Sequence, residues 1–120
     1  MEKYQELYNT FIDNYKKTET PPSEVGEVLA RIASLYPNYN ISVVKAENAF
    51  NLIHKEIAEK VDDSGKNISS AKAEVIAKAT PEALDFKMSS CHISNIEMLI
   101  SSLKFLQKSL EVEYSNSNLS

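Results

Sequence analysis

The sequence predicts an all-α protein whose main feature is a long, kinked helical hairpin with a short N-terminal helix. Two glycines and four prolines in 120 residues are too few for the many turns of a β fold. Apolar residues also recur at alternating steps of four and three, the spacing that keeps one helix face against a partner. This first seam comprises Val25, Leu29, Ile32, Tyr36, Tyr39, Val43, Ala46, Phe50, Ile53 and Ile57.

Length and charge place limits on the class of protein. A chain of 120 residues is expected to form one domain, residues 1–120. Its 13 basic and 17 acidic residues give a net charge of −4, so there is no overall attraction to nucleic acid or to an acidic membrane surface. The charged start MEKYQELYN, the single Cys91 and the lack of an apolar run of about 18 residues predict a cytoplasmic protein without a membrane segment.

Residues 1–20 are expected to form an N-terminal helix or arm. Between residues 2 and 17, aromatic and aliphatic side chains follow one helix face at steps of three and four. This helix can dock on the core of its own chain or act as an exchange arm on a neighbouring subunit. Pro21 and Pro22 then end it. The stripe is Tyr4, Leu7, Tyr8, Phe11, Ile12 and Tyr15.

The first long helix is expected over residues 23–61, with a kink near Pro37. A proline inside a helix removes one hydrogen bond and usually resets the apolar phase. Here the seam keeps its phase on both sides of Pro37, which favours a kinked helix. The alternative is two helices that meet at residues 36–40, where Asn38 and Asn40 are typical turn residues.

The segment DDSGKN, residues 62–67, predicts a turn, with Gly65 in a left-handed backbone position. Its acidic start invites comparison with a calcium loop. In a loop that starts at Asp63, however, the sixth position holds Ile68 instead of glycine and the third holds Gly65. No metal site is therefore predicted.

The second helical arm is expected over residues 69–115, with Ser69 or Ser70 as the first cap. Thr80, Pro81 and Glu82 form a fresh helix start: a capping residue, a proline at the first helical position and an acid in the first turn. The arm is thus either broken or kinked near Pro81. The polar tail, residues 116–120, is expected to fray.

The last helix carries two apolar faces. One is centred on Ile96 and is the expected core face; it also includes Met88, Ile93, Leu99, Ile100, Leu103, Leu106, Leu110 and Tyr114. The other recurs at intervals of seven and lies on the opposite side: Cys91, Met98, Phe105 and Val112. A helix that is apolar on two sides is normally buried on two sides, so these four residues are candidates for a homo-oligomer interface. The alternative is that the N-terminal helix of the same chain covers them.

Catalytic chemistry has little support in the sequence. His54 and His92 belong to different helices, and the neighbouring side chains of Cys91 and His92 diverge by about 100° on a helix. Neither a zinc motif nor a phosphate-binding loop is present. We expect no enzymatic activity and no cofactor.

Lysines around the turn are the candidates for nucleic-acid binding. Lys55, Lys60, Lys66 and Lys72 flank or lie within it. Lysine ammonium groups bind phosphates, and many weak contacts add up in an oligomer. The alternative is an ordinary charged surface, because acidic residues interleave with the lysines: Glu56, Glu59, Asp62, Asp63 and Glu74.

The layout of residues 25–115 resembles the UvsY-like recombination mediators of bacteriophages. The shared features are the turn VDDSGKN, the entry AKAEV and the long final helix that begins EALDFKMSS. The resemblance implies ring oligomers that bind single-stranded DNA and help to load a recombinase, in the host cytoplasm. Of the basic residues that this family carries just before the turn, only Lys60 is present here.

We therefore expect a non-enzymatic accessory factor of DNA recombination or replication. Its expected partners are copies of itself, single-stranded DNA, and recombination or replication proteins. The alternative is a helical protein-interaction module without nucleic-acid binding, such as a virion component or an inhibitor of a host defence protein.

Overall fold

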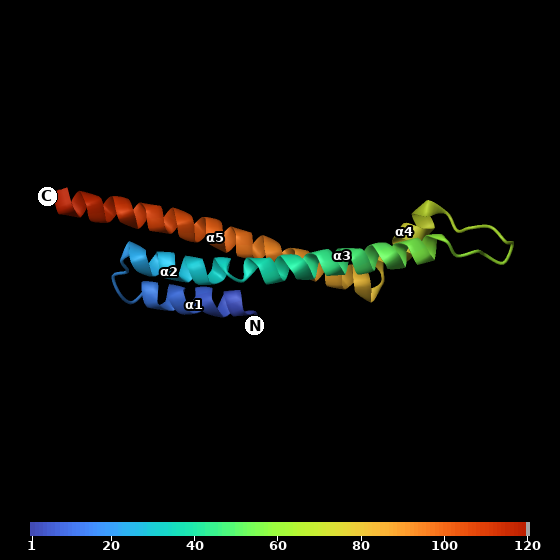
Figure 1. Cartoon of the computed structure of the whole chain (residues 1–120), viewed down its shortest axis with the longest axis horizontal. Helices are drawn as coiled ribbons and strands as arrows, with labels where there is room; N and C mark the ends of the chain where they lie inside the picture. The colour runs from blue at the N-terminus through green and yellow to red at the C-terminus, as the bar shows by residue number, and fades with distance from the viewer. Residues whose placement is uncertain (120) are drawn as a thin grey trace. The chain divides into compact units, whose positions relative to one another are not determined.

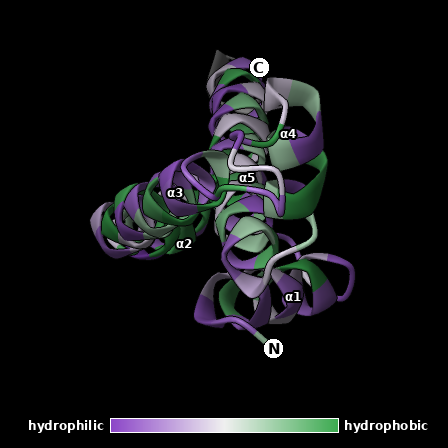
Figure 2. Cartoon of the chain, turned by 90° about the vertical axis from the view of Figure 1, so that its right-hand side faces the viewer, coloured by the Kyte–Doolittle hydropathy of each residue, from purple (hydrophilic) through white to green (hydrophobic). Residues whose placement is uncertain are grey.

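The computed structural model describes residues 1–119, with side chains up to residue 116, and the chain is all-α as predicted. Its helices are α1 (Lys3–Tyr15), α2 (Pro22–Ala33), α3 (Tyr36–Ala58), α4 (Ser70–Lys78) and α5 (Pro81–Leu119) (Figure 1). Hydrophobic and hydrophilic residues alternate along the ribbons, as expected of amphipathic helices (Figure 2). Within the described residues, no helix is long and apolar enough to cross a membrane.

The predicted helical hairpin is confirmed by the order of the contacts between its two arms. Pro22 and Tyr36, at the two ends of one arm, bond to Gln107 and Glu97 in α5. Further along, Tyr39 packs near His92 and Phe50 near Phe86. From Pro22 to Phe50 the residue number rises, while the number of the contacted residue in α5 falls from 107 to 86. The helix α5 therefore runs antiparallel to α2 and to α3.

The contacts divide the chain into two compact units, although the length of the chain predicts a single domain. Each unit has a core of its own. Unit 1 comprises Met1–Pro37 and the part of α5 from Ser94 onward, and unit 2 comprises Asn38–Ile93.

Unit 1 is a three-helix group of α1, α2 and the later part of α5. Tyr4 and Phe11 of α1 pack inward, and the Tyr4 hydroxyl accepts a hydrogen bond from Asn95 Nδ2 at 3.3 Å. The helix α1 therefore docks within its own chain, the first of the two alternatives for this segment. The buried apolar residues of unit 1 are Tyr4, Phe11, Val25, Val28, Ile32, Ile96, Leu103 and Leu110.

Unit 2 groups α3, α4 and the first part of α5. Its core is small: Ala73 and Ala77 of α4 are completely buried against Ile57 of α3. Small side chains allow α4 to approach closely, and half-buried apolar residues pack around this contact: Phe50, Ile53 and Ile68. All ten residues of the first seam are buried or half-buried.

The expected kink near Pro37 takes the form of a short interruption just before the proline. Ser34 and Leu35 form a turn whose amides still bond to the carbonyls of Ala30 and Ile32. Pro37 is the second residue of α3, where its missing N–H has no helical partner to lose. The apolar phase survives because the backbone stays close to helical in the turn: Ser34 has φ −65° and ψ −19°, and its amide still bonds to the Ala30 carbonyl.

The start signals of the last two helices are confirmed. Ser69 caps α4 by accepting a bond from the Lys72 amide at 3.2 Å, and Thr80 Oγ1 accepts one from the Ala83 amide at 3.2 Å. The helix α5 starts at Pro81, so the arm is broken there. The helix α5 continues to Leu119, so the expectation of a frayed tail at 116–120 is wrong for residues 116–119, and residue 120 lies outside the described residues.

The core of unit 1 can be tested at two adjacent residues of α5. The Leu103 side chain is 1% exposed, whereas Lys104 is exposed. Leu103→Ala removes buried methyl groups and leaves a cavity, so we expect a loss of about 2–5 kcal/mol in the free energy of unfolding. Lys104→Ala should change it by no more than about 0.5 kcal/mol. Urea unfolding followed by circular dichroism measures both, and equal effects would contradict the described core.

Candidate functional site

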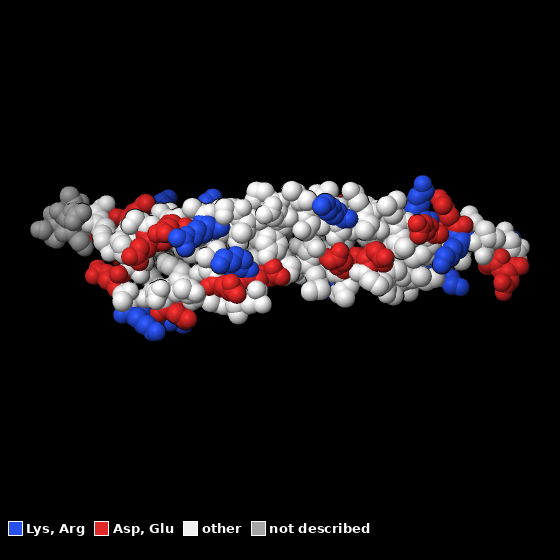
Figure 3. Space-filling model, turned by 60° about the horizontal axis from the view of Figure 1, so that its bottom comes forward, with Lys and Arg blue, Asp and Glu red and all other residues white. Residues whose placement is uncertain are grey.

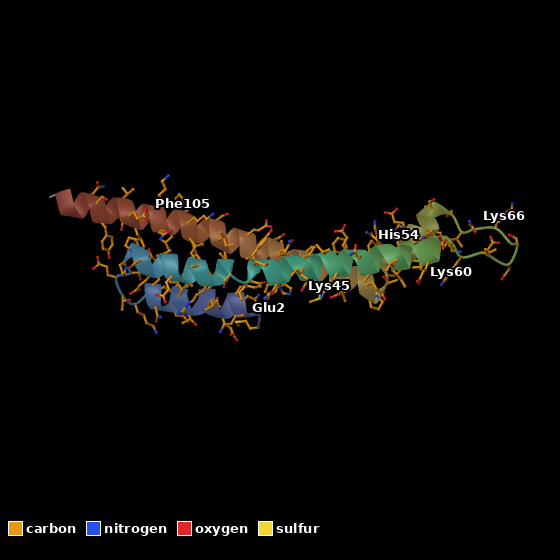
Figure 4. All side chains as sticks on the ribbon, in the orientation of Figure 1. Glu2, Lys45, His54, Lys60, Lys66 and Phe105 are labelled. Atoms are coloured by element: carbon orange, nitrogen blue, oxygen red, sulfur yellow. The ribbon has the colours of Figure 1, made fainter. Side chains whose placement is uncertain are left out.

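The first candidate surface is an exposed face of α5 in unit 1, which we call the α5 stripe. The helix α1 lies at one edge of it, where Asn95 donates a hydrogen bond to the Tyr4 hydroxyl. Its apolar members are strongly exposed: Met98 is 64%, Phe105 76% and Val112 54% accessible to solvent. Phe105 is labelled on α5 in Figure 4. Between these residues lie small polar ones at steps of three and four. The complete α5 stripe is Asn95, Met98, Ser102, Phe105, Ser109 and Val112.

The same heptad positions continue toward the start of α5, in unit 2. Cys91, the fourth candidate interface residue from the sequence, is exposed there with a free thiol. Leu84 is 59% and Met88 is 53% exposed. The prediction that Met88 belongs to the core face is therefore wrong, because at about 80° from Ile96 it lies at the edge of that face. Leu84, seven residues before Cys91, was missed although its spacing signals it.

A second exposed apolar face lies on α3 in unit 2 and was also missed from the sequence. Ile41 and Val44 are each 52% exposed and Leu52 is 63% exposed. These three residues fall within about 80° of one another on the helix, opposite the buried seam. The buried seam of ten residues masks this weaker pattern in the sequence.

Two open grooves lie in unit 1. The larger, of about 680 Å³, lies between α1 and α2 and has charged side chains of both signs in its walls, among them Lys3, Glu6, Glu24, Glu27 and Arg31. The smaller, of about 290 Å³, lies between α1 and α5 and includes Tyr8, Met98 and Leu99. The smaller groove thus opens beside the α5 stripe.

The second candidate surface is the lysine tip, which we define as Lys55, Lys60, Lys66 and Lys72 of unit 2. The loop brings Lys60 and Lys66 onto the two arms of a small hairpin, closed by an antiparallel bridge between Val61 and Asn67. Lys72 follows in the first turn of α4, and Lys55 lies in the last turn of α3. All four are exposed, and no described carboxylate forms an ion pair with them. Figure 4 labels Lys60 and Lys66 at this end.

Asp62 organises the loop that carries the lysine tip. Its Oδ1 accepts bonds from the Ser64 hydroxyl at 2.6 Å, the Ser64 amide at 2.9 Å and the Lys66 amide at 3.0 Å. These bonds lower the pKa of the Asp62 carboxyl below its ordinary value of 3.8, and the bond from the Ser64 hydroxyl has the largest effect. The positive charge of Lys72 lowers this pKa further. Gly65 has φ +83°, the left-handed position predicted for it.

Acidic side chains accompany the lysines. At the right-hand end of the face drawn in Figure 3, lysine and acidic side chains lie next to one another. Lys78 pairs with Glu74 at 2.9 Å, and this contact lowers the pKa of the Glu74 carboxyl. Glu56, Glu59 and Asp63 are also exposed. The lysine tip is therefore a charge-mixed surface with free ammonium groups and no uniform positive patch.

The two histidines lie against aromatic rings. The ring centroids of His54 and Phe50 are 5.9 Å apart, and those of His92 and Tyr39 are 5.7 Å apart. Among the described residues, no three His, Cys, Asp or Glu side chains converge in a way that could hold a metal ion. Tyr36 donates a hydrogen bond to Glu97 at 3.2 Å, which raises the pKa of the Tyr36 hydroxyl.

No family model, curated protein or solved structure matches this chain significantly.

The role of Asp62 leads to a pH-dependent prediction. Because its folded-state pKa is lowered, its contribution to loop stability is present above its ordinary value of 3.8 and is lost as the pH falls through the lower folded value. Amide hydrogen exchange at Ser64 and Lys66 should therefore accelerate in acid relative to the intrinsic rate. Asp62→Asn should show fast exchange already at neutral pH. Unchanged protection in that variant would contradict the role of Asp62.

Proposed function

We propose that this chain is a non-enzymatic helical protein that works as a homo-oligomer and serves as a phage-type accessory factor in DNA recombination or replication. The observation that carries the proposal is the α5 stripe, which leaves Phe105 and Met98 largely in water. Burial of one such side chain contributes about 1.5–3 kcal/mol, so covering several of them favours association. The layout-level resemblance to the UvsY-like mediators agrees with this role and remains a prediction.

The lysine tip supports contact with single-stranded DNA. Its four ammonium groups are exposed and free of ion pairs with described carboxylates, and the Asp62 loop holds two of them on one hairpin. Acidic neighbours weaken the attraction of each tip for phosphate. An oligomer would present several tips to one strand, and their weak contacts would add through effective concentration.

A second candidate function is a protein-interaction module without nucleic-acid binding, such as a virion component or an inhibitor of a host defence protein. The mixed charge of the lysine tip and the net charge of −4 favour it. The same α5 stripe or the exposed α3 face would then bind a partner protein.

Phe105→Glu tests the assembly. A carboxylate at the centre of a covered apolar face would be buried without a partner, so we expect the variant to dissociate to single chains that stay helical. Lys104→Glu is the matched control, because this neighbouring side chain points away from the α5 stripe. Light scattering after size exclusion gives the mass, and circular dichroism gives the helix content. If Phe105→Glu keeps the mass of the unmodified chain, the α5 stripe is not the interface.

Charge reversal tests DNA binding. The triple variant Lys60→Glu, Lys66→Glu and Lys72→Glu should lose co-elution with a poly-dT oligonucleotide at low salt, whereas the unmodified oligomer should bind it and release it as salt rises. The control variant reverses three exposed lysines of unit 1 and has the same net charge: Lys3, Lys16 and Lys17.

The comparison of the two triple variants separates the hypotheses. Loss of binding only in the first variant supports the lysine tip, and equal loss in both points to net charge instead. An unmodified oligomer that ignores the oligonucleotide would reject DNA binding and favour the protein-interaction module.

A further inference from the structure

The α5 stripe alternates large apolar and small polar side chains in a regular order. Met98, Phe105 and Val112 are seven residues apart, and Asn95, Ser102 and Ser109 fill the intervening positions at the same period. These are the two core positions of a heptad repeat. One of these positions holds the large side chains Met98, Phe105 and Val112. The other holds Asn95, Ser102 and Ser109, whose smaller side chains leave space for large side chains of a partner helix.

The helix surface around the α5 stripe carries no charge from residue 94 to residue 112. At about 100° per residue, Glu97, Lys104, Lys108 and Glu111 all lie about 90° or more from the centre line of the stripe. The flanking positions hold Ser94, Leu99, Ser101 and Leu106 instead. A lack of charged residues is typical of the buried centre of a protein interface and is unlike a surface that binds phosphates.

The stripe is complementary to itself in one orientation. If a second copy lies antiparallel, with the two-fold axis between Leu103 and Lys104, each large residue meets a small one. The layers are then Asn95 with Val112, Met98 with Ser109, and Ser102 with Phe105, each formed twice. This register pairs all six residues of the α5 stripe with one another, whereas any other antiparallel register leaves some of them without a partner from the set.

We propose that two copies of this chain pair through their α5 stripes as an antiparallel, two-fold symmetric helix pair with this register. The inference rests on the proposed homo-oligomer and specifies its contact surface. Layers that combine large and small side chains interdigitate without voids, and a two-fold interface uses the same patch on both copies. Its unit of assembly is a dimer.

A parallel pairing fits the same residues poorly. It would place Phe105 against Phe105 and Met98 against Met98, and between them Ser102 against Ser102 and Asn95 against Asn95. Bulky layers would then hold the helices apart at the small polar layers and leave voids there. The size alternation along α5 thus selects the orientation.

The groove between α1 and α5 adjoins the proposed contact. It opens beside Asn95, Met98 and Leu99 and is about 290 Å³ in volume. In the antiparallel pair, the position opposite Asn95 belongs to Val112 of the second copy, so this apolar side chain lies at the groove.

Cysteine cross-linking tests orientation and register together. In a Cys91→Ser background, one chain carries Asn95→Cys and a second, size-tagged chain carries Val112→Cys. The antiparallel pair brings these two positions together, so oxidation of the mixture should give a disulfide-linked heterodimer. Each variant alone should give almost none, because identical positions lie about seventeen residues apart, about 25 Å at 1.5 Å per residue, and a disulfide needs Cα atoms within about 7 Å.

A mixture of Asn95→Cys with Lys104→Cys is the matched control and should not cross-link, because Lys104 faces away from the stripe. Efficient cross-linking of each variant alone would show a parallel pair and overturn the proposal. If the chain has the mass of an oligomer but no sample cross-links, the proposed antiparallel register is also overturned. The proposed function would then remain intact. A single-chain mass at all concentrations would overturn both.

Discussion

The core face of α5 is the interaction on which unit 1 depends. Ile96, Leu103 and Leu110 recur every seven residues and are between 0% and 8% exposed against α1 and α2. A helix turns by about 100° per residue, so a face fixed at these positions puts Met98, Phe105 and Val112 on the other side. Burial of one face therefore determines which face stays in water. In unit 2, the close approach of α4 through Ala73 and Ala77 has the same effect on the exposed side of α3.

Much of the fold could be predicted from periodicity and capping signals. The seam from Val25 to Ile57, the caps at Ser69 and Thr80, and the left-handed Gly65 each depend on local rules that tertiary contacts do not override. The position of the kink was harder to predict from the sequence. Pro37 is compatible with both a kink and the first turn of a new helix, and the short turn at Ser34 and Leu35 carries no strong signal of its own.

The candidate site could be predicted only in part. The apolar residues of the α5 stripe follow a period of seven and can be predicted from the sequence. Asn95, Ser102 and Ser109 are polar and therefore do not appear in the hydrophobic pattern. Their importance becomes visible only when their exposure and their neighbours are known. The turn predicts that Lys60 and Lys66 lie near each other, but the bonds from Ser64 and Lys66 that close the loop on Asp62 were not predicted. Met88 was misplaced because it lies at the boundary between two faces of one helix.

The two candidate surfaces differ in chemistry, and this difference suggests a division of roles. The α5 stripe combines large apolar with small polar side chains and is free of charge, which suits contact with another protein surface, and its size alternation suits a second copy of itself. The lysine tip is exposed and charge-mixed, which suits weak contacts that become effective only in number. In the proposed function, assembly comes first and binding by the lysine tip depends on it.

The measurement that tests the central claim most directly is the molar mass of the unmodified chain by light scattering over a wide range of dilution. We expect a mass that is an even multiple of a single chain at high concentration and falls toward that of a single chain on dilution, because the free energy of association comes from one buried apolar face. A mass that equals a single chain throughout would show that the α5 stripe stays exposed to water and would contradict the claim that this stripe drives assembly.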